Sequence, residues 1–490
     1  MLADRRVKIV GTIGPATSSK ENLKHAITSG LNVARLNFSH GQHEDHLAVI
    51  KNIRELILEL KAPVAILQDL QGPKIRVGQF EQGQIELVKD DVVVITTEET
   101  LGKSGLIPTD FKKLPQACKV GDKILFDDGL MDVTVIEVSS TTLKAKVNFG
   151  GILKNRKGMN VPGVMLPVDC MTKKDIEDLK FGLSQQVDFV ALSFVRQGSD
   201  IIKLREIIQQ HSPSTQIIAK IEMMEAIENL EDIIQLSDGV MVARGDLAVE
   251  VGQTRLPAIQ KRIINLANQF NKPVITATQM LDSMIQNPRP TRAEITDVAN
   301  AVMDGSDALM LSAETASGKY PFRCIETMDE IIREVEKDPS FYYDLNLDQE
   351  EMDVAESIGA SACLTTLKLK ASAIVCLSTT GRTAKVISGY RPQARIIAIT
   401  HLLHTLNRLE LVWGVQTYSI NAYKSTDDAM SQVEDLLLRY GLVKAGDRVV
   451  LTLGVPVVEK SKTNSLRVYT IGDRFVEKEP NDRLPLRCRD

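Results

Sequence analysis

Short apolar segments alternate with amphipathic segments along most of the first 340 residues, and this alternation constrains the fold most strongly. Amphipathic stretches such as 43–60, 200–210 and 256–270 have the spacing of helices. The apolar segments have the length and the Val, Ile and Leu content of buried parallel strands. They cover residues 8–14, 32–39, 188–194, 217–222, 239–244, 272–280 and 307–312, with one more that begins at residue 64. Eight strands interleaved with helices predict a (β/α)₈ barrel, or TIM barrel.

Two regions depart from this pattern, one between about residues 79 and 160 and one that begins near residue 339. Between about residues 79 and 160 the chain has short strands and turns, with Asp128-Gly129 as a hairpin signal. We therefore expect an α/β protein with three domains: a barrel from 1–70 and 167–338, an inserted all-β, β-barrel lid domain from 71–166, and a C-terminal open α/β domain from 339–490. A doubly wound open sheet is the alternative for the barrel. Such a sheet gathers polar residues at one switch point, whereas most of these strands end in polar or charged residues.

Composition excludes several classes of protein. The net charge of −5 argues against a general nucleic-acid or membrane-surface binder. The first residues lack the apolar core of a signal peptide, and no apolar run approaches the ~18 residues of a membrane span. The six cysteines form no C-x-x-C pair and are expected to be reduced thiols. We expect a cytoplasmic protein that binds neither nucleic acid nor membrane.

Two neighbouring strands end in charged residues. Lys220 and Glu222 lie two residues apart and therefore face the same side of a strand. The next strand ends in Arg244-Gly245-Asp246. Two carboxylates, one from each strand, can share one divalent cation with the oxygen ligands that Mg²⁺ prefers, and Lys220 then faces the anion that the metal holds. A purely structural ion pair between Lys220 and Glu222 is the alternative.

Other strand ends add further polar groups. Arg35 and Arg76 join Lys220 as cations that could bind an anion. The remaining residues of this set are Thr12, Asn37, Ser39, Asp69, Lys74, Thr278, Ser312 and Glu314. Arginine grips phosphate through two parallel hydrogen bonds, and lysine acts as a point charge. Because phosphoryl transfer depends on positioning and charge neutralisation, it needs this mixture. Any single arginine is more often a surface salt-bridge partner, but several at successive strand ends favour a shared anion.

These residues belong to motifs that resemble the pyruvate kinase family over essentially the whole chain, in order. The motifs are NVARLNFSHG, LQDLQGPKIRVG, DDGL, KGMNVPG, AKIE, MVARGDL, ATQMLDSM, RPTRAEITDVANAV and DALMLSAETASGKYP. The chain is most similar in plan to bacterial-type members without an N-terminal helical extension. The resemblance implies the last step of glycolysis, in which phosphoenolpyruvate and ADP give pyruvate and ATP. It also implies Mg²⁺, which Mn²⁺ can replace, and a homotetramer.

The resemblance also implies a role for each site residue. Glu222 and Asp246 would bind Mg²⁺, Lys220 would stabilise the phosphoryl group in flight, and Arg35 would hold its oxygens. Backbone amides near Gly245 and Asp246 would hold the substrate carboxylate. The enolate would be protonated on the face where Thr278 lies, by Thr278 itself or by a water that it relays. Contacts to the nucleotide would come from Asn37, Ser39, His40, Arg76 and Lys157, the last from a lid that excludes water.

One departure concerns monovalent cations. Many family members bind K⁺ near the equivalents of Asn37, Ser39 and Asp69, and carry Thr at position 70 and Glu at position 74. This chain has Leu70 and Lys74, which in the family accompany K⁺ independence. The Lys74 ammonium would replace the ion, so we expect K⁺ not to be required; the alternative is that Lys74 points to solvent.

A loop of small polar residues follows the strand predicted at 372–378. It comprises Ser378, Thr379, Thr380, Gly381, Arg382 and Thr383, and it opens a helix. Such a helix N-terminus is a ready anion site, although ordinary capping by Thr380 is the alternative. Family members bind a regulatory phosphate here, so we expect a phosphorylated allosteric effector. Position 379 lacks the lysine of some bisphosphate-regulated relatives, which favours a monophosphate.

Two other functions would use parts of the same sequence. An aldolase-type lyase acting on phosphoenolpyruvate or pyruvate would use Glu222 and Asp246 but would not need the lid or Lys157. A catalytically silent metabolite sensor would keep the phosphate loop alone. The sensor is disfavoured because the chain keeps the residues of the chemistry, Lys220, Glu222, Asp246 and Thr278.

Overall fold

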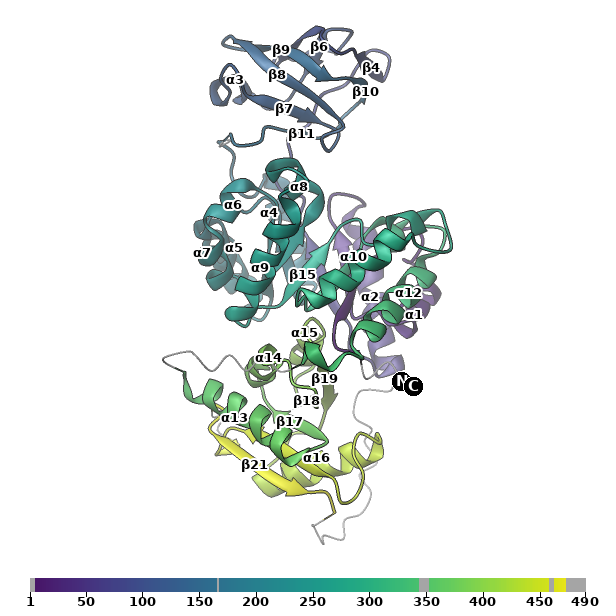
Figure 1. Cartoon of the computed structure of the whole chain (residues 1–490), viewed down its shortest axis with the longest axis vertical. Helices are drawn as coiled ribbons and strands as arrows, with labels where there is room; N and C mark the ends of the chain where they lie inside the picture. The colour runs from purple at the N-terminus through teal and green to yellow at the C-terminus, as the bar shows by residue number, and fades with distance from the viewer. Residues whose placement is uncertain (1–4, 165–166, 343–351, 458–461, 473–490) are drawn as a thin grey trace.

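The computed structural model describes residues 5–164, 167–342, 352–457 and 462–472. Three bodies are stacked along the long axis of the molecule (Figure 1). An all-β body lies at one end, a barrel surrounded by helices lies in the middle, and an α/β body lies at the other end. None of the helices in these described residues is long and apolar enough to cross a lipid bilayer.

The middle body is a closed barrel of eight parallel strands, as predicted. Its strands are β1 (Lys8–Thr12), β2 (Val33–Asn37), β3 (Ala65–Asp69), β12 (Phe189–Leu192), β13 (Gln216–Ile221), β14 (Gly239–Ala243), β15 (Val274–Ala277) and β16 (Ala308–Leu311). The ring closes because β1 pairs with both β2 and β16. An open doubly wound sheet has two free edges, so this closure excludes that alternative.

Helices surround the ring and bury their apolar faces against it. They are α1 (Lys20–Thr28), α2 (His43–Leu60), α4 (Lys173–Ser184), α5 (Gly198–His211), α6 (Met224–Glu228), α7 (Leu230–Leu236), α8 (Arg244–Val251), α9 (Leu256–Gln269), α10 (Arg292–Met303), α11 (Ala313–Ala316) and α12 (Pro321–Val335). Local sequence sets their starts: Thr291 caps α10 and Glu294 reaches back to complete a capping box. Inside the ring, side chains such as Val10, Ile218 and Met241 fill a separate core.

The all-β body is inserted between β3 and α4 and has its own apolar core. Its elements are β4 (Gln84–Leu87), β5 (Val92–Thr96), β6 (Leu106–Pro108), α3 (Leu114–Ala117), β7 (Lys123–Phe126), β8 (Met131–Val138), β9 (Thr142–Phe149), β10 (Gly151–Lys154) and β11 (Met159–Asn160). Six strands form one sheet, and β4 pairs with β10. The predicted hairpin at Asp128-Gly129 joins the antiparallel strands β7 and β8.

The C-terminal body is an open sheet in the order β19-β18-β17-β20-β21, which confirms the predicted α/β class. Its elements are α13 (Val354–Leu369), β17 (Ala373–Leu377), α14 (Arg382–Gly389), β18 (Arg395–Thr400), α15 (Leu403–Leu409), β19 (Val415–Ser419), α16 (Thr426–Arg439), β20 (Arg448–Leu453) and β21 (Ser465–Thr470). It packs under the amino ends of the barrel strands, where Lys8 Nζ donates to the Val415 carbonyl at 2.6 Å.

Candidate active site

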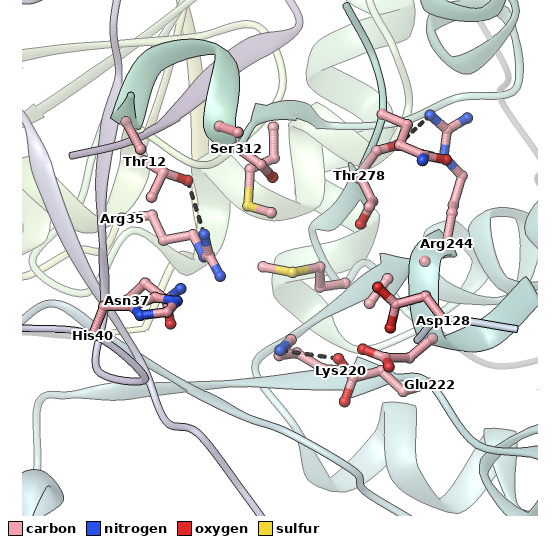
Figure 2. Close-up of a pocket in the computed structure, with 18 of the residues that line it drawn as sticks. Thr12, Arg35, Asn37, His40, Asp128, Lys220, Glu222, Arg244, Thr278 and Ser312 are labelled. Atoms are coloured by element: carbon pink, nitrogen blue, oxygen red, sulfur yellow. Dashed lines mark hydrogen bonds and ion pairs between the residues drawn. The ribbon is translucent and has the colours of Figure 1, made fainter. Parts of the chain in front are cut away.

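The carboxyl ends of the barrel strands and the inserted β body enclose a cleft of about 1940 Å³. Asp127, Asp128 and Leu130 line it from the β7–β8 hairpin. Figure 2 shows charged side chains from several strand ends pointing into this space. The predicted site residues that line it are Arg35, Asn37, His40, Lys74, Lys220, Glu222, Gly245, Asp246 and Thr278.

Lys220 lies at the end of β13 among acceptors. Its Nζ lies 2.9 Å from Glu222 Oε1 and 3.3 Å from Asp69 Oδ1, and it donates to Ser193 Oγ at 2.7 Å. Burial by itself lowers the pKa of Lys220, but Asp69 and Glu222 outweigh it and raise that pKa above its ordinary value. Lys220 is therefore an ammonium at neutral pH. The ion pair weighed as a structural alternative does form, and it lines the cleft.

Asp69 also orients Arg35. Arg35 Nε donates to Asp69 Oδ2 at 2.7 Å, and its Nη1 donates to Thr12 Oγ1 at 2.9 Å. Burial by itself raises the pKa of Asp69, yet Lys220 and Arg35 overcome it and hold that pKa below its ordinary value. One ionised carboxylate thus holds two cations at the wall of the cleft, an arrangement suited to a polyanion.

Glu222 and Asp246 are the carboxylates best placed to hold a divalent cation. Glu222 Oε2 accepts from the Phe194 amide at 2.7 Å, and burial raises the pKa of Glu222. Asp246 lies in the first turn of α8. Among the described residues no group of three or more His, Cys, Asp or Glu side chains is arranged around one point. Two carboxylates beside an open cleft fit Mg²⁺, which completes its shell with water and substrate oxygens.

Lys74 enters the cleft from the segment that joins the barrel to the lid. Its Nζ donates to Asp246 Oδ1 at 2.9 Å and lies 3.6 Å from Asp128 Oδ1. Burial by itself lowers the pKa of Lys74, but Asp246 outweighs it and raises that pKa. The ammonium therefore points to the carboxylates of the cleft and not to solvent.

Only some of the residues predicted to contact the nucleotide line the cleft. Asn37 and His40 line the cleft, whereas Ser39, Arg76 and Lys157 are not among its lining residues. Lys157 approaches it indirectly, because its Nζ pairs at 2.8 Å with Asp127 Oδ1 of the lid hairpin.

Thr278 follows β15 and lines the cleft in a left-handed backbone conformation, with φ +77°. Gly245 lies against it: a Cβ on Gly245 would stand 3.1 Å from Thr278 Cγ2. A glycine at this position therefore lets α8 begin close to Thr278.

Three residues of this region were not predicted as site residues: Ser193, Asp127 and Asp297. Ser193 follows β12 and accepts from Lys220, so its place at a strand end was a usable signal. Asp127 comes just before the hairpin signal that was recognised. Asp297 lies on α10, away from any strand end, so its membership of the motif RPTRAEITDVANAV was its only signal.

The loop 378–383 lies in the C-terminal body beside a small cavity of about 110 Å³. Ser378, Thr379, Thr380, Arg382 and Thr383 line it, with Tyr423, Lys462 and Thr463 from elsewhere. The sixth loop residue, glycine 381, is the N-cap of α14 with φ +80°. The cavity is thus lined by hydroxyls and two cations.

Comparison with known proteins agrees with this geometry. Residues 4–325 match the model of the pyruvate kinase barrel domain, and residues 356–469 match that of the pyruvate kinase alpha/beta domain. Pyruvate kinase of Geobacillus stearothermophilus is 45% identical over 474 residues, covering 96% of this chain and 81% of that protein. Pyruvate kinase of Bacillus licheniformis is 44% identical over the same shares of both chains. A crystal structure of a pyruvate kinase from Cryptosporidium parvum is similar with a TM-score of 0.90 at 37% identity, covering 96% of this chain and 97% of that one. The chain is a phosphotransferase and belongs to the pyruvate kinase family.

Proposed function

We propose that this enzyme transfers the phosphoryl group of phosphoenolpyruvate to ADP, giving pyruvate and ATP. The observation that carries the proposal is the buried Lys220 ammonium, which lies in the cleft between Asp69 and Glu222. An ammonium of this kind suits a phosphoryl group that moves between two oxygens, because the charge spread over that group needs a fixed cation.

Each residue then has a distinct task. When bound at Glu222 and Asp246, Mg²⁺, or Mn²⁺ in its place, neutralises charge on the substrate oxygens. Lys220 stabilises the phosphoryl group during transfer, and Arg35 holds its oxygens through its two-pronged guanidinium. The amides of Gly245 and Asp246 point from the N-terminus of α8 and bind the substrate carboxylate.

Thr278 takes part in forming pyruvate, and a separate set of residues binds the nucleotide. Thr278, or a water that it holds, delivers a proton to the enolate left after transfer. The nucleotide is bound by Asn37, Ser39, His40, Arg76 and Lys157. Because Arg76 and Lys157 lie at the lid, closure of the lid brings them toward the nucleotide and excludes water that would hydrolyse the phosphoryl group.

Lys74 takes the place of a monovalent cation in this proposal. Its ammonium lies 2.9 Å from Asp246, so one fixed positive charge already stands beside the metal ligands. Assay in tetramethylammonium buffer with and without K⁺ tests this role. Equal rates are expected, and strong activation by K⁺ would contradict it.

The loop 378–383 binds a phosphorylated effector, and a monophosphate fits best. The two cations of its cavity, Arg382 and Lys462, and the amides at the start of α14 supply the charge and the donors. Replacing Thr380 and Thr383 by Ala should abolish activation by a sugar or nucleoside monophosphate and leave the unactivated rate unchanged. Activation that survives the double replacement would place the effector elsewhere. We further propose a homotetramer, which light scattering tests.

One assay separates the main function from its alternatives. Pyruvate release is followed through lactate dehydrogenase and NADH, with and without ADP. Turnover that requires ADP supports the kinase. Turnover without ADP would indicate a lyase, and no turnover under either condition would indicate a sensor.

A further inference from the structure

The backbone at the end of β15 is strained where the chain enters the cleft. Thr278 and Gln279 both have positive φ, +77° and +56°. Positive φ is uncommon outside glycine and is an outlier for a β-branched residue such as threonine. Conformations of this kind persist only where surrounding contacts enforce them. The enforcing contacts should therefore be visible next to Thr278.

Arg244 supplies those contacts. Its Nη2 donates to the Thr278 carbonyl at 2.7 Å, and its Nε donates to the same carbonyl at 3.2 Å and to the Ala277 carbonyl at 3.1 Å. Figure 2 shows the guanidinium of Arg244 on the side of Thr278 away from Lys220. Two N–H groups on one carbonyl fix the orientation of the peptide plane that follows Thr278.

Arg244 is itself held in place. Its Nη1 lies 2.8 Å from both carboxylate oxygens of Asp297 on α10, and its side chain is only 11% exposed. An arginine fixed at one side by a carboxylate and at the other by a carbonyl has little freedom to turn. The contacts Asp297–Arg244–Thr278 thus join three separate barrel segments at the cleft: α10, the start of α8 and the end of β15.

We propose that Arg244 is a positioning residue that holds Thr278 in its left-handed conformation and so aims its hydroxyl at the cleft. This inference rests on the proposed role of Thr278 in protonating the enolate. In that step a C–H bond forms at the methylene carbon while an O–H bond of Thr278, or of the water it holds, breaks. The enolate oxygen becomes the ketone, and solvent returns the proton. The guanidinium of Arg244 is engaged by the Ala277 and Thr278 carbonyls and by Asp297, so in this proposal it acts through Thr278.

If Arg244 acts only through Thr278, its replacement should slow protonation of the enolate and leave substrate binding largely unchanged. A displacement of about 1 Å at a reacting group can cost roughly 10²-fold in rate. Replacing Arg244 by Gln should therefore lower kcat by about that factor. It should lower the exchange of pyruvate methyl hydrogens with deuterium oxide by a similar factor, and leave KM for phosphoenolpyruvate within about twofold. Arg244→Lys keeps the charge but loses the fork, and should be equally impaired.

A double-variant cycle tests whether Arg244 acts through Thr278. The variants are R244Q, T278A and the two combined, with methyl-hydrogen exchange followed by NMR. Because both changes remove the same function, the combined variant should exchange no more slowly than T278A alone. Losses that multiply in the combined variant, or an unimpaired R244Q, would overturn the proposal. An unimpaired T278A would instead refute the role of Thr278 in the proposed function.

Arg205 offers a matched control for loss of structure. It also donates to a backbone carbonyl, that of Leu236 at 2.9 Å, and pairs with an aspartate, Asp238, at 2.9 Å. Arg205→Gln should leave kcat and exchange unchanged. If R244Q does not fold, D297N removes the charge that holds Arg244 and should lower exchange in the same direction by a smaller factor. Unchanged exchange in D297N would then count against the proposal.

Discussion

The two ends of the barrel both bury charged residues, but they use them differently. At the amino end, three aspartates each precede a strand and accept a hydrogen bond from the backbone of a neighbouring strand. The pairs are Asp188 with Ile66 at 2.8 Å, Asp238 with Ile217 at 2.8 Å and Asp307 with Val274 at 2.9 Å. At the carboxyl end, Lys220 pairs with Glu222 and Arg35 pairs with Asp69, and both cations line the large cleft.

The amino end is also covered by the C-terminal body. Arg391 pairs with Asp307 at 3.3 Å, and Arg408 donates to the Ser214 carbonyl at 2.8 Å. These groups have structural partners and face no large space. A charge at a strand end is therefore weak evidence for catalysis until the structure shows whether it faces a cavity or a neighbouring backbone.

The sharpest test of this contrast is Lys220→Met. Removing the ammonium takes away charge that is needed only while the phosphoryl group moves, so kcat should fall by roughly 10³-fold or more. Steady-state kinetics with circular dichroism of the purified variant measures this. A folded variant with full kcat would show that the buried charge at the carboxyl end is structural, like the charges at the amino end.

The metal site gives the next largest effect. Asp246→Asn removes one of two carboxylates, and Mn²⁺ affinity should fall by more than the roughly 10–100-fold that loss of an outer partner costs. Electron paramagnetic resonance of free Mn²⁺ measures binding without relying on turnover. Asp128→Asn is the control, because Asp128 lies in the same cleft on the exposed hairpin and should change affinity little.

At the amino end the same kind of change should affect stability instead. Asp307→Ala removes the buried carboxylate that pairs with Arg391 and leaves the Val274 amide without its acceptor, which should cost about 3–5 kcal/mol of unfolding free energy. Urea denaturation measures this cost, and kcat per folded molecule should not change. Glu59→Ala, which breaks an exposed pair with Lys24, should stay within about 0.5 kcal/mol of the parent. A large loss of kcat in Asp307→Ala would contradict the division of roles.

A buried carboxyl near the cleft gives the smallest effect. Glu250 on α8 bonds to the Asn160 amide of the lid at 3.3 Å, and burial raises the pKa of Glu250 to about 7. A raised pKa means that the folded state holds its proton longer than the unfolded state. This contribution is therefore complete below the unfolded value and is lost as pH rises through about 7.

Glu250→Gln should consequently flatten the fall in stability between about pH 5 and pH 8, and the variant should gain most at pH 8. Thermal unfolding midpoints across that range measure the difference. If the thermal midpoints of parent and variant change with pH in the same way, burial does not raise the pKa of Glu250.

Much of this could be predicted from local sequence. Because side chains alternate along a strand, the two-residue spacing predicted that Lys220 and Glu222 share one face. The eight apolar segments predicted the eight strands of the barrel. The contact between Lys220 and Asp69 depends on the strand order β3-β12-β13, in which β12 pairs with both neighbours although the lid separates β3 from β12 in sequence. No periodicity within one segment encodes that meeting.

Other features had weaker or unread signals. The left-handed Thr278 lies in the run ATQM, which contains no glycine to mark a positive φ. The three aspartates at the amino end did leave a signal, since Asp188, Asp238 and Asp307 each stand just before an apolar run. Its meaning becomes clear only when the neighbouring backbone is known.

Pairing of the first strand with the last has a consequence for the growing polypeptide. During synthesis β1 emerges early, but its neighbour β16 ends only at Leu311. Until then the nascent ring has two open edges, while the inserted β body already has its full sequence. The cleft is therefore assembled late, and a chain cut short before residue 308 contains the whole lid sequence but lacks the strand that closes the barrel.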